Sequence, residues 1–177
     1  MTRPRGDEYD SFYETYVSKV PDQPLSTVLA EAPAAVESLL REVSLKDESW
    51  TYAERKWSLR EVLGHVVDTE RIFSYRALHM ARSDPAELPG MDQEVWAAAS
   101  NAAGRTLADL LAEFRGLREA NTRLFASFDE ATLDRRGRAS GVGFTVRALG
   151  YIIAGHEIHH RQVLTEVYLA GLRATRG

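Results

Sequence analysis

Three of the five histidines in this 177-residue chain lie together in the segment His156-Glu157-Ile158-His159-His160. The segment reads H-E-x-x-H, a pattern in which two histidines on one helical face bind zinc and the glutamate is the general base of a metalloprotease. A third ligand would be needed, and the metzincin extension would place glycine at 163 and histidine at 166. The chain instead has Val163 and Glu166. Because the sequence ends at residue 177, we also expect no later helix to supply a glutamate ligand. A peptidase is therefore not predicted.

The first and last histidines of this segment occupy positions where a helix would normally carry core side chains. Steps of three and four residues connect them to apolar neighbours, which is the spacing of a core-facing seam. The seam comprises Val146, Leu149, Ile153, His156, His160, Val163 and Val167. Buried imidazoles are either satisfied by hydrogen bonds or bound to a metal, and one metal would satisfy both rings at once. We therefore expect His156 and His160 to bind a metal, whereas His159 lies off the seam.

The third ligand is expected from upstream, where His65 and His79 are the remaining histidines. They are about 21 Å apart on one helix, at a rise of about 1.5 Å per residue, so only one can join the site. His65 lies among apolar residues near the start of that helix, whereas His79 lies near its end and is expected to contact solvent. A site of His65, His156 and His160 leaves one or more coordination positions open. Zinc or nickel is favoured. Iron and manganese remain alternatives, because imidazole is not selective among these metals.

Helical periodicity dominates the chain and predicts an all-α fold in which four long helices position these histidines. The expected bounds are 25–44, 58–81, 106–128 and 145–171. Two of the helices begin at a hydroxyl residue that can cap them, Ser58 and Thr106, and the fourth is expected to begin near Thr145. Pro33 indicates a kink or a later start for the first helix. Ser83-Asp84-Pro85 is expected to end the second helix, and Gly171 the fourth.

Two shorter helical segments complete the expected fold. Aromatic residues recur at helical spacing near the N-terminus, so residues 1–22 are expected to form an arm that packs on the bundle. These residues are Tyr9, Phe12, Tyr13 and Tyr16. A second short helix, Met91 to Ala99 with Trp96, lies within the long connection 82–105. A connection of this length can follow the whole bundle and lets helices two and three run parallel. We therefore predict a single domain, 1–177, built as a four-helix bundle with one long crossover.

The composition excludes several classes of protein. The chain has no cysteine, which excludes disulfides, thiolate metal ligands and a nucleophilic thiol of its own. The net charge is −4, and the one basic cluster, Arg135-Arg136-Gly137-Arg138, is interpreted as a solvated turn. No nucleic-acid partner is therefore expected. No apolar run approaches the roughly 20 residues that span a bilayer, and the first residues do not resemble a secretory signal. We expect a cytoplasmic protein without membrane association.

Two segments of the sequence resemble the DinB-like superfamily, in the branch that includes bacillithiol transferases. They are Lys56-Trp57-Ser58-Leu59-Arg60-Glu61-Val62-Leu63-Gly64-His65 and Gly155-His156-Glu157-Ile158-His159-His160-Arg161-Gln162. In that family a tryptophan-serine pair opens the second helix, a histidine of this helix is a ligand, and the last helix supplies H-x-x-x-H. Leu88-Pro89-Gly90-Met91-Asp92-Gln93 is similar to the family's crossover, and the arm ending at Val20-Pro21 to its N-terminal arm. The resemblance implies helices in up-down-down-up order, a homodimer, and a divalent metal on His65, His156 and His160.

Characterised members of that family transfer low-molecular-weight thiols such as bacillithiol or mycothiol to electrophiles, or isomerise maleylpyruvate with such a thiol. The resemblance therefore implies a metal-dependent transferase that moves a thiol onto a small molecule through a metal-bound thiolate. A hydrolase that uses metal-bound water and a non-catalytic, metal-stabilised, stress-related binding protein are the alternatives. Asp68 and Thr69 are candidates to orient ligands, although Asp68 can equally be a solvent-facing carboxylate. Arg161 and Arg147 are candidate anion-binding residues.

Overall fold

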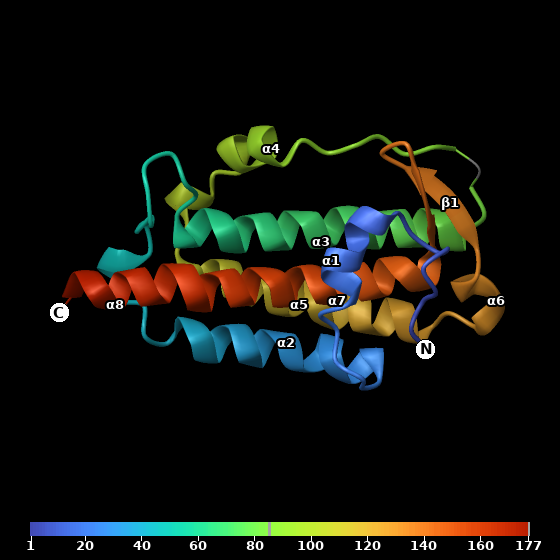
Figure 1. The fold of residues 1–177 in the computed structure, drawn as a ribbon, viewed down its shortest axis with the longest axis horizontal. Helices are drawn as coiled ribbons and strands as arrows, with labels where there is room; N and C mark the ends of the chain where they lie inside the picture. The colour runs from blue at the N-terminus through green and yellow to red at the C-terminus, as the bar shows by residue number, and fades with distance from the viewer. Residues whose placement is uncertain (85, 177) are drawn as a thin grey trace.

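A computed structural model describes residues 1–84 and 86–176. Four long helices lie side by side and form most of the molecule (Figure 1). They are α2 (Leu25–Leu40), α3 (Leu59–Ala81), α5 (Leu107–Ala126) and α7 (Val146–Val163). In Figure 1, α2 and α7 run toward the end of the bundle that carries the C-terminus, and α3 and α5 run away from it. The predicted all-α bundle in up-down-down-up order is therefore confirmed.

Three of the long helices begin at a capping hydroxyl residue: Ser58 and Thr106, as expected, and also Thr145. The Ser58 hydroxyl accepts a hydrogen bond from the Glu61 backbone N–H at 3.3 Å, while the Glu61 carboxylate accepts one from the Ser58 backbone N–H at 2.7 Å. The corresponding bonds in α5 and α7 run from the Asp109 N–H to Thr106 at 3.1 Å and from the Ala148 N–H to Thr145 at 3.0 Å. Each cap satisfies a backbone donor that the helix leaves unpaired, and so determines where the helix begins.

Helix α2 differs from its expected bounds. It begins at Leu25, so Pro33 lies inside the helix and does not mark a later start. It ends at Leu40, four residues before the expected end. Pro33 is buried and lies at the interface between α2 and α5. A proline inside a helix removes one backbone hydrogen-bond donor, which is unfavourable. Burial of the apolar Pro33 ring opposes this loss.

The last helix continues beyond its expected end. After α7, a π turn spans Leu164–Leu169, and α8 spans Ala170–Arg176. A π turn contains one more residue than an α turn and rotates the side chains that follow. Val167, which the sequence pattern placed on the core seam, is consequently 39% exposed. Gly171 lies inside α8 and therefore does not end the helix. A Cβ atom at this position would lie 2.6 Å from the Trp50 ring, so the glycine lets Trp50 pack closely.

The crossover and the N-terminal arm cover the bundle. The connection between α3 and α5 returns along the length of α3 (Figure 1) and contains α4 (Gln93–Ala99), the short helix expected there. Pro85, expected to help end the second helix, lies outside the described residues. The arm forms a 3₁₀ turn at Ser11–Tyr13 and α1 at Glu14–Val17, and α1 packs across α7. Another short helix, α6 (Glu130–Leu133), follows α5.

A short β-hairpin precedes α7, and the sequence pattern did not reveal it. Strands β1 (Arg136–Ala139) and β2 (Val142–Thr145) pair antiparallel. Between them, Ser140 and Gly141 have φ values of 56° and 80°, the left-handed pair that a two-residue type I′ turn requires. The basic cluster Arg135-Arg136-Gly137-Arg138 lies mainly in a strand and not in a turn, although its arginines are exposed to solvent as expected.

Two clusters of buried apolar side chains fill the bundle. The cluster near the arm includes Phe73 and Ile153, and the other includes Leu63 and Leu164. His65 lies among α3 residues of the second cluster, His156 lies among α7 residues of the first, and His160 falls between the two clusters on α7. The bundle therefore encloses a polar site between two apolar regions. Among the described residues, no helix has the length and apolar character needed to cross a bilayer.

Candidate metal centre

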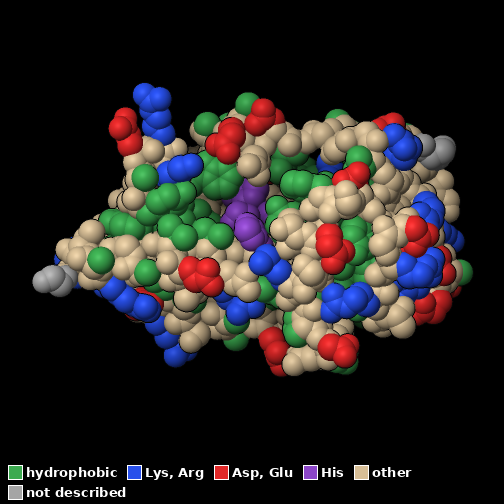
Figure 2. All heavy atoms as spheres, in the orientation of Figure 1, with side chains coloured by type: hydrophobic (Ala, Val, Ile, Leu, Met, Phe, Trp, Pro, Cys, Tyr) green, Lys and Arg blue, Asp and Glu red, His purple; other side chains and the backbone are tan. Residues whose placement is uncertain are grey.

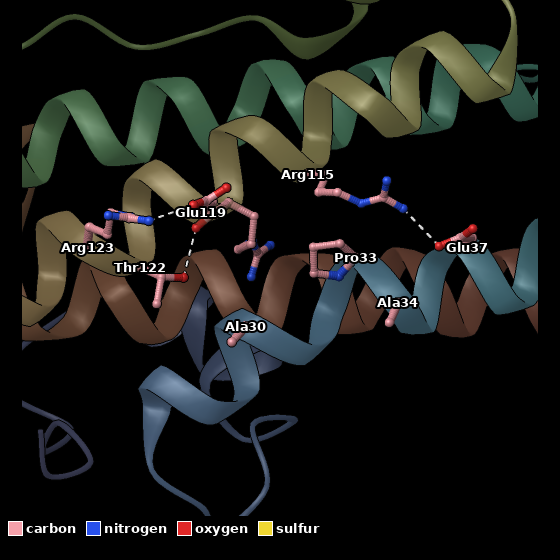
Figure 3. A pocket seen from close by; sticks show the side chains of 9 residues that line it. Ala30, Pro33, Ala34, Glu37, Arg115, Glu119, Thr122 and Arg123 are labelled. Atoms are coloured by element: carbon pink, nitrogen blue, oxygen red, sulfur yellow. Dashed lines mark hydrogen bonds and ion pairs between the residues drawn. The ribbon is translucent and has the colours of Figure 1, made fainter.

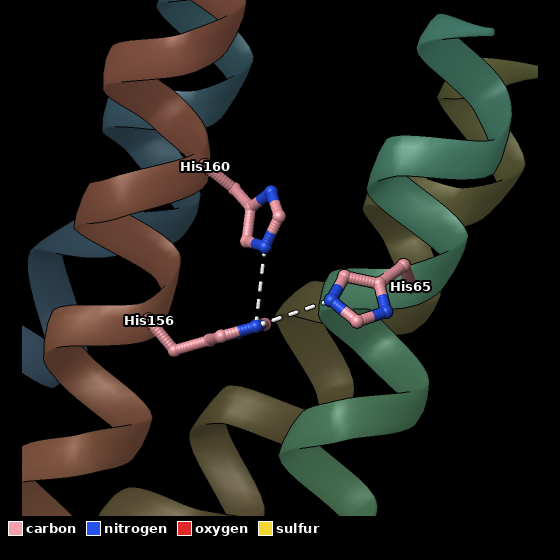
Figure 4. A group of neighbouring side chains, drawn as sticks. All are labelled: His65, His156 and His160. Carbon is pink, nitrogen blue, oxygen red and sulfur yellow. Dashed lines mark hydrogen bonds between the residues drawn. The ribbon is translucent and has the colours of Figure 1, made fainter. Parts of the chain in front are cut away.

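The three histidines predicted as metal ligands converge in the fold. His65 projects from α3, and His156 and His160 project toward it from successive turns of α7 (Figure 4). The Nε2 atom of His156 lies 3.2 Å from that of His65 and 3.2 Å from that of His160. One ring nitrogen of each residue lies within 4.8 Å of the others. The two helices therefore place three imidazole nitrogens around a common point.

This arrangement of donors fits a metal ion better than a hydrogen-bonded cluster. A neutral imidazole Nε2 either carries one hydrogen or offers one lone pair, so His156 can bond to only one of its two neighbours through this atom. The Nε2 atom of the second neighbour, His65 or His160, then has no hydrogen-bond partner in the cluster. A buried polar atom without a partner is energetically unfavourable. Two nitrogen ligands on a tetrahedral zinc at about 2.0–2.1 Å would lie roughly 3.3 Å apart, close to the observed 3.2 Å. The three imidazoles therefore fit one divalent metal ion.

Burial keeps the three imidazoles in the neutral form. His65 and His156 are each 5% exposed, and His160 is half-buried. Burial lowers the pKa of His65 to about 4 and that of His160 to about 3. Burial, together with the neighbouring His160 and His65, also holds the pKa of His156 well below its ordinary value. The three rings are therefore unprotonated near neutral pH, which is the state in which imidazole binds metals.

Neighbouring side chains orient the rings. Thr69, predicted to act one turn beyond His65, places its Oγ1 atom 3.4 Å from the His65 Nδ1 atom. A hydrogen bond at Nδ1 leaves Nε2 as the nitrogen that faces the cluster. The Trp57 ring lies 4.7 Å from the His65 ring, and the Tyr16 ring packs against His156 at 5.2 Å, measured between ring centroids. Thr69, Trp57 and Tyr16 thus border the site on several sides.

The structure places two other residues singled out in the sequence outside the histidine cluster. Asp68 is half-buried and does not belong to the histidine cluster. Its Oδ1 atom lies 3.7 Å from the Nη1 atom of Arg71. Arg147 is 5% exposed and forms ion pairs of 2.7 Å with both Glu130 and Asp134. The charge of Arg147 is balanced within the fold, so the structure does not support it as an anion-binding residue.

The remaining candidates lie beside the cluster or far from it. Glu157 is 2% exposed, and its Oε1 atom accepts a hydrogen bond from the Arg161 Nε atom at 2.8 Å. Burial raises the pKa of Glu157, and the Arg161 charge opposes that rise. Arg161 is thus bound to Glu157. His159 is half-exposed and lies outside the cluster, as predicted. The expectation that His79 contacts solvent is wrong, because its side chain is only 9% exposed and lies 3.3 Å from Asp84.

A cavity of about 210 Å³ opens onto His65 and His156. Its walls come from the arm, the middle of α3, the crossover and the hairpin, and they include Tyr16, Phe73 and Arg76. Among the described residues, no aspartate or glutamate lines this cavity. Figure 2 shows histidine atoms that reach the surface in a depression bordered by hydrophobic side chains. The cluster is therefore accessible to a small molecule.

A larger cavity of about 490 Å³ lies between α2 and α5, away from the histidines (Figure 3). Four charged residues at this cavity pair with one another, and a fifth, Arg118, pairs with the buried Glu70. Arg115 lies 2.8 Å from Glu37, and Arg123 lies 2.7 Å from Glu119. Within the described part of the chain, the only group of three potential metal ligands is the histidine cluster, so the larger cavity holds no comparable site.

Comparisons with known proteins agree with this architecture. The chain belongs to the DinB superfamily, whose family model matches residues 29–164 and thus all three histidines of the cluster. The solved structure of YfiT from Bacillus subtilis is similar, and that protein is described as a probable metal-dependent hydrolase with an unusual four-helix bundle topology. The TM-score is 0.73 at 17% sequence identity, over 89% of this chain and 97% of that chain. No curated protein matches the chain significantly. The family resemblance read from the sequence is therefore confirmed, and the likeness to YfiT supports the fold.

Proposed function

We propose that this protein is a metal-dependent transferase that moves a low-molecular-weight thiol onto a small electrophile. The observation that carries the proposal is the three-histidine cluster beside a cavity that no carboxylate lines among the described residues. A bound divalent metal would lower the pKa of a thiol and hold it as a thiolate. A thiol activated in this way needs no general base from the protein, which agrees with the composition of the cavity wall.

The residues of the chain have separate parts in this proposal. His65, His156 and His160 would hold the metal, and Thr69 would keep the His65 ring in the tautomer that presents Nε2. The aromatic rings of the cavity wall would exclude water and provide an apolar surface for the electrophile. Because the chain has no cysteine, the thiol would enter as a cosubstrate.

Hydrolysis, with water in place of the thiol, is the second candidate, and the description of YfiT as a probable metal-dependent hydrolase favours it. A hydrolase commonly uses a protein base to take a proton from water. Glu157 is adjacent to His156 in sequence, but it is buried, bonded to Arg161 and absent from the cavity wall. We therefore place thiol transfer ahead of hydrolysis.

The proposal also covers the metal and the partners. Zinc or nickel is the favoured metal, because three imidazoles bind both well, with iron and manganese next. A small molecule and a thiol are the proposed ligands, with no nucleic acid, and the proposed assembly is a cytoplasmic homodimer. Metal analysis of the purified protein and sedimentation equilibrium test the metal and the dimer separately.

The catalytic proposal is tested by a screen of thiols with the fluorogenic electrophile monobromobimane. Bacillithiol, mycothiol, glutathione and free cysteine are each tested with metal-loaded protein, and the uncatalysed rate is subtracted. We expect catalysed transfer with at least one thiol, its loss in His156→Ala, and its retention in His79→Ala, whose histidine lies outside the cluster. Full activity in His156→Ala would contradict the proposal.

Two other outcomes favour the rival functions. Turnover of an ester or amide without added thiol, lost in His156→Ala, would favour hydrolysis. Melting of the fold when the metal is removed, without turnover of any substrate, would favour a structural role for the metal.

A further inference from the structure

Arg76 is a buried cation in the wall of the cavity that opens onto the histidines. It lies on α3, eleven residues after His65, or about 16 Å along the helix axis at a rise of about 1.5 Å per residue. Side chains on a helix lean toward its N-terminus, so the side chain of Arg76 extends back in the direction of His65. The residue is 4% exposed and lines the same cavity as His65 and His156.

The partners of Arg76 among the described residues are neutral. Its Nη2 atom donates hydrogen bonds to the Pro89 carbonyl oxygen at 3.0 Å and to the Ser140 hydroxyl at 2.9 Å. The carbon of the guanidinium lies 5.5 Å from the centre of the Phe73 ring. Within the described residues, no aspartate or glutamate forms an ion pair with Arg76, and its remaining polar neighbour is the Tyr13 hydroxyl, which lies within hydrogen-bonding reach of the guanidinium.

Other buried arginines of this protein are treated differently by the fold. Arg118 is 1% exposed and lies 2.8 Å from the Glu70 carboxylate, and Arg147 is paired with Glu130 and Asp134. A buried charge without an opposite charge is unfavourable, because desolvation is not repaid by an ion pair. Burial accordingly lowers the pKa of Arg76, and the Tyr13 hydroxyl, which opposes that change, is the titratable neighbour that acts on it.

The hydrogen-bonding groups of Arg76 that remain free are suited to an anion. A guanidinium presents its N–H groups as a planar fork that matches the two oxygens of a carboxylate. Arg76 lines a cavity of about 210 Å³, which is smaller than the about 300–1,000 Å³ typical of sites for drug-sized ligands. The available space therefore suits a small acid.

We propose that Arg76 binds the carboxylate of a small-molecule substrate, and that the electrophile is therefore a small carboxylic acid. The acid would lie along α3 with its carboxylate at Arg76 and its reactive carbon toward His65 and His156. Binding of the carboxylate depends only on Arg76 and the cavity, whereas the direction of the reactive carbon rests on the function proposed above. Arg76 is thus assigned to substrate recognition, and it supplies the opposite charge that this buried position lacks within the chain.

The test compares benzoate with benzamide, which has a similar shape but no charge. Dissociation constants are measured by ligand-observed NMR with the protein as purified and with four variants: Arg76→Met, Arg76→Lys, His156→Ala and Arg123→Met. Arg123 is the matched control, because it is an exposed arginine paired with Glu119. We expect benzoate to bind about tenfold or more tightly than benzamide, as a charge-assisted hydrogen bond allows. Arg76→Met should abolish this preference, Arg76→Lys should keep part of it, and Arg123→Met should leave it unchanged.

The variants separate this inference from the proposed function. If benzoate instead binds the metal centre, the preference survives in Arg76→Met and disappears in His156→Ala, and the inference is overturned. A preference that depends on Arg76 and survives in His156→Ala supports the inference even when no thiol is transferred. An unchanged preference in a folded Arg76→Met variant overturns it.

A second readout does not depend on the folding of Arg76→Met. The Nε–H signal of Arg76 is assigned in a ¹H–¹⁵N spectrum of the intact protein by its absence from Arg76→Lys. We expect benzoate to shift this signal and benzamide to leave it in place. No shift at saturating benzoate would overturn the inference.

Discussion

A Cβ atom on Gly155 would lie 2.0 Å from the carbonyl oxygen of Tyr16, so the backbone of the N-terminal arm lies directly against α7, one residue before His156. Only glycine permits this approach, because it has no side chain. The Tyr16 ring lies 5.2 Å from the His156 ring between centroids. The position of the arm is therefore coupled to the shape of the histidine cluster.

Replacement of this glycine should move the arm. We expect Gly155→Ala to lower the free energy of unfolding by about 1–3 kcal/mol, because the obstructing atoms are backbone and cannot rotate away. Activity should also fall, since Tyr16 lines the cavity. Urea denaturation measures the change in stability. The matched control is Gly116→Ala in α5, where a Cβ meets nothing within 4 Å and alanine should raise stability by about 0.5–1 kcal/mol. Equal effects of the two substitutions would contradict the close packing of the arm.

The buried ion pair between Arg118 and Glu70 provides a second prediction. The two side chains are 1% and 2% exposed, and the Asn121 amide also donates to Glu70 at 2.9 Å. Arg118→Met would leave a buried carboxylate without its counter-charge, so we expect a loss of about 3–5 kcal/mol in the free energy of unfolding. The exposed Arg123→Met should lose less than about 1 kcal/mol. Recovery in the double variant Arg118→Met with Glu70→Leu would identify the stranded charge as the cause, whereas a loss no larger than that of Arg123→Met would disprove it.

The histidine cluster predicts a pH dependence for the metal-free protein. The pKa values of His65 and His160 are lowered from 6.5 to about 4 and about 3, so the unfolded chain binds more protons than the folded one over that range. The free energy of unfolding should therefore fall as the pH decreases from about 6.5 toward 4, by roughly 1.4 kcal/mol per pH unit for each such proton. Urea denaturation of chelator-treated protein at several pH values measures this slope. His65→Gln should reduce it, and a slope unaffected by that change would argue against a buried, neutral His65.

The sequence was sufficient to predict the helices and the histidine cluster, because both depend on local patterns. Ser58 and Thr145 are local signals for helix starts, and the spacing of His156 and His160 follows from helical geometry. His65 could be assigned because only two histidines lie upstream, and His65 is the one among apolar residues near the start of its helix, whereas His79 lies near the end. The family resemblance gave the order of the helices, which periodicity alone could not determine.

The features that the sequence did not reveal depend on distant contacts or on short segments. Arg76 resembles an exposed helical arginine until the crossover residue Pro89 and the hairpin residue Ser140 are placed over it. The hairpin strands have four residues each, too few for a strand alternation to stand out. The turn residues of the hairpin, Ser140 and Gly141, were the one signal in the sequence that could have indicated it. The π turn that exposes Val167 has no distinct signature in the residue pattern.

The central claim is that His65, His156 and His160 together hold one divalent metal ion. Its most direct test is the metal content of the purified protein, measured by inductively coupled plasma mass spectrometry after dialysis, for the intact chain and for three single variants. We predict one equivalent of a divalent metal in the intact protein and in His79→Ala, and its loss in His65→Ala and His156→Ala. Retention of a full equivalent by folded His65→Ala and His156→Ala, or loss of the metal in His79→Ala alone, would contradict the claim.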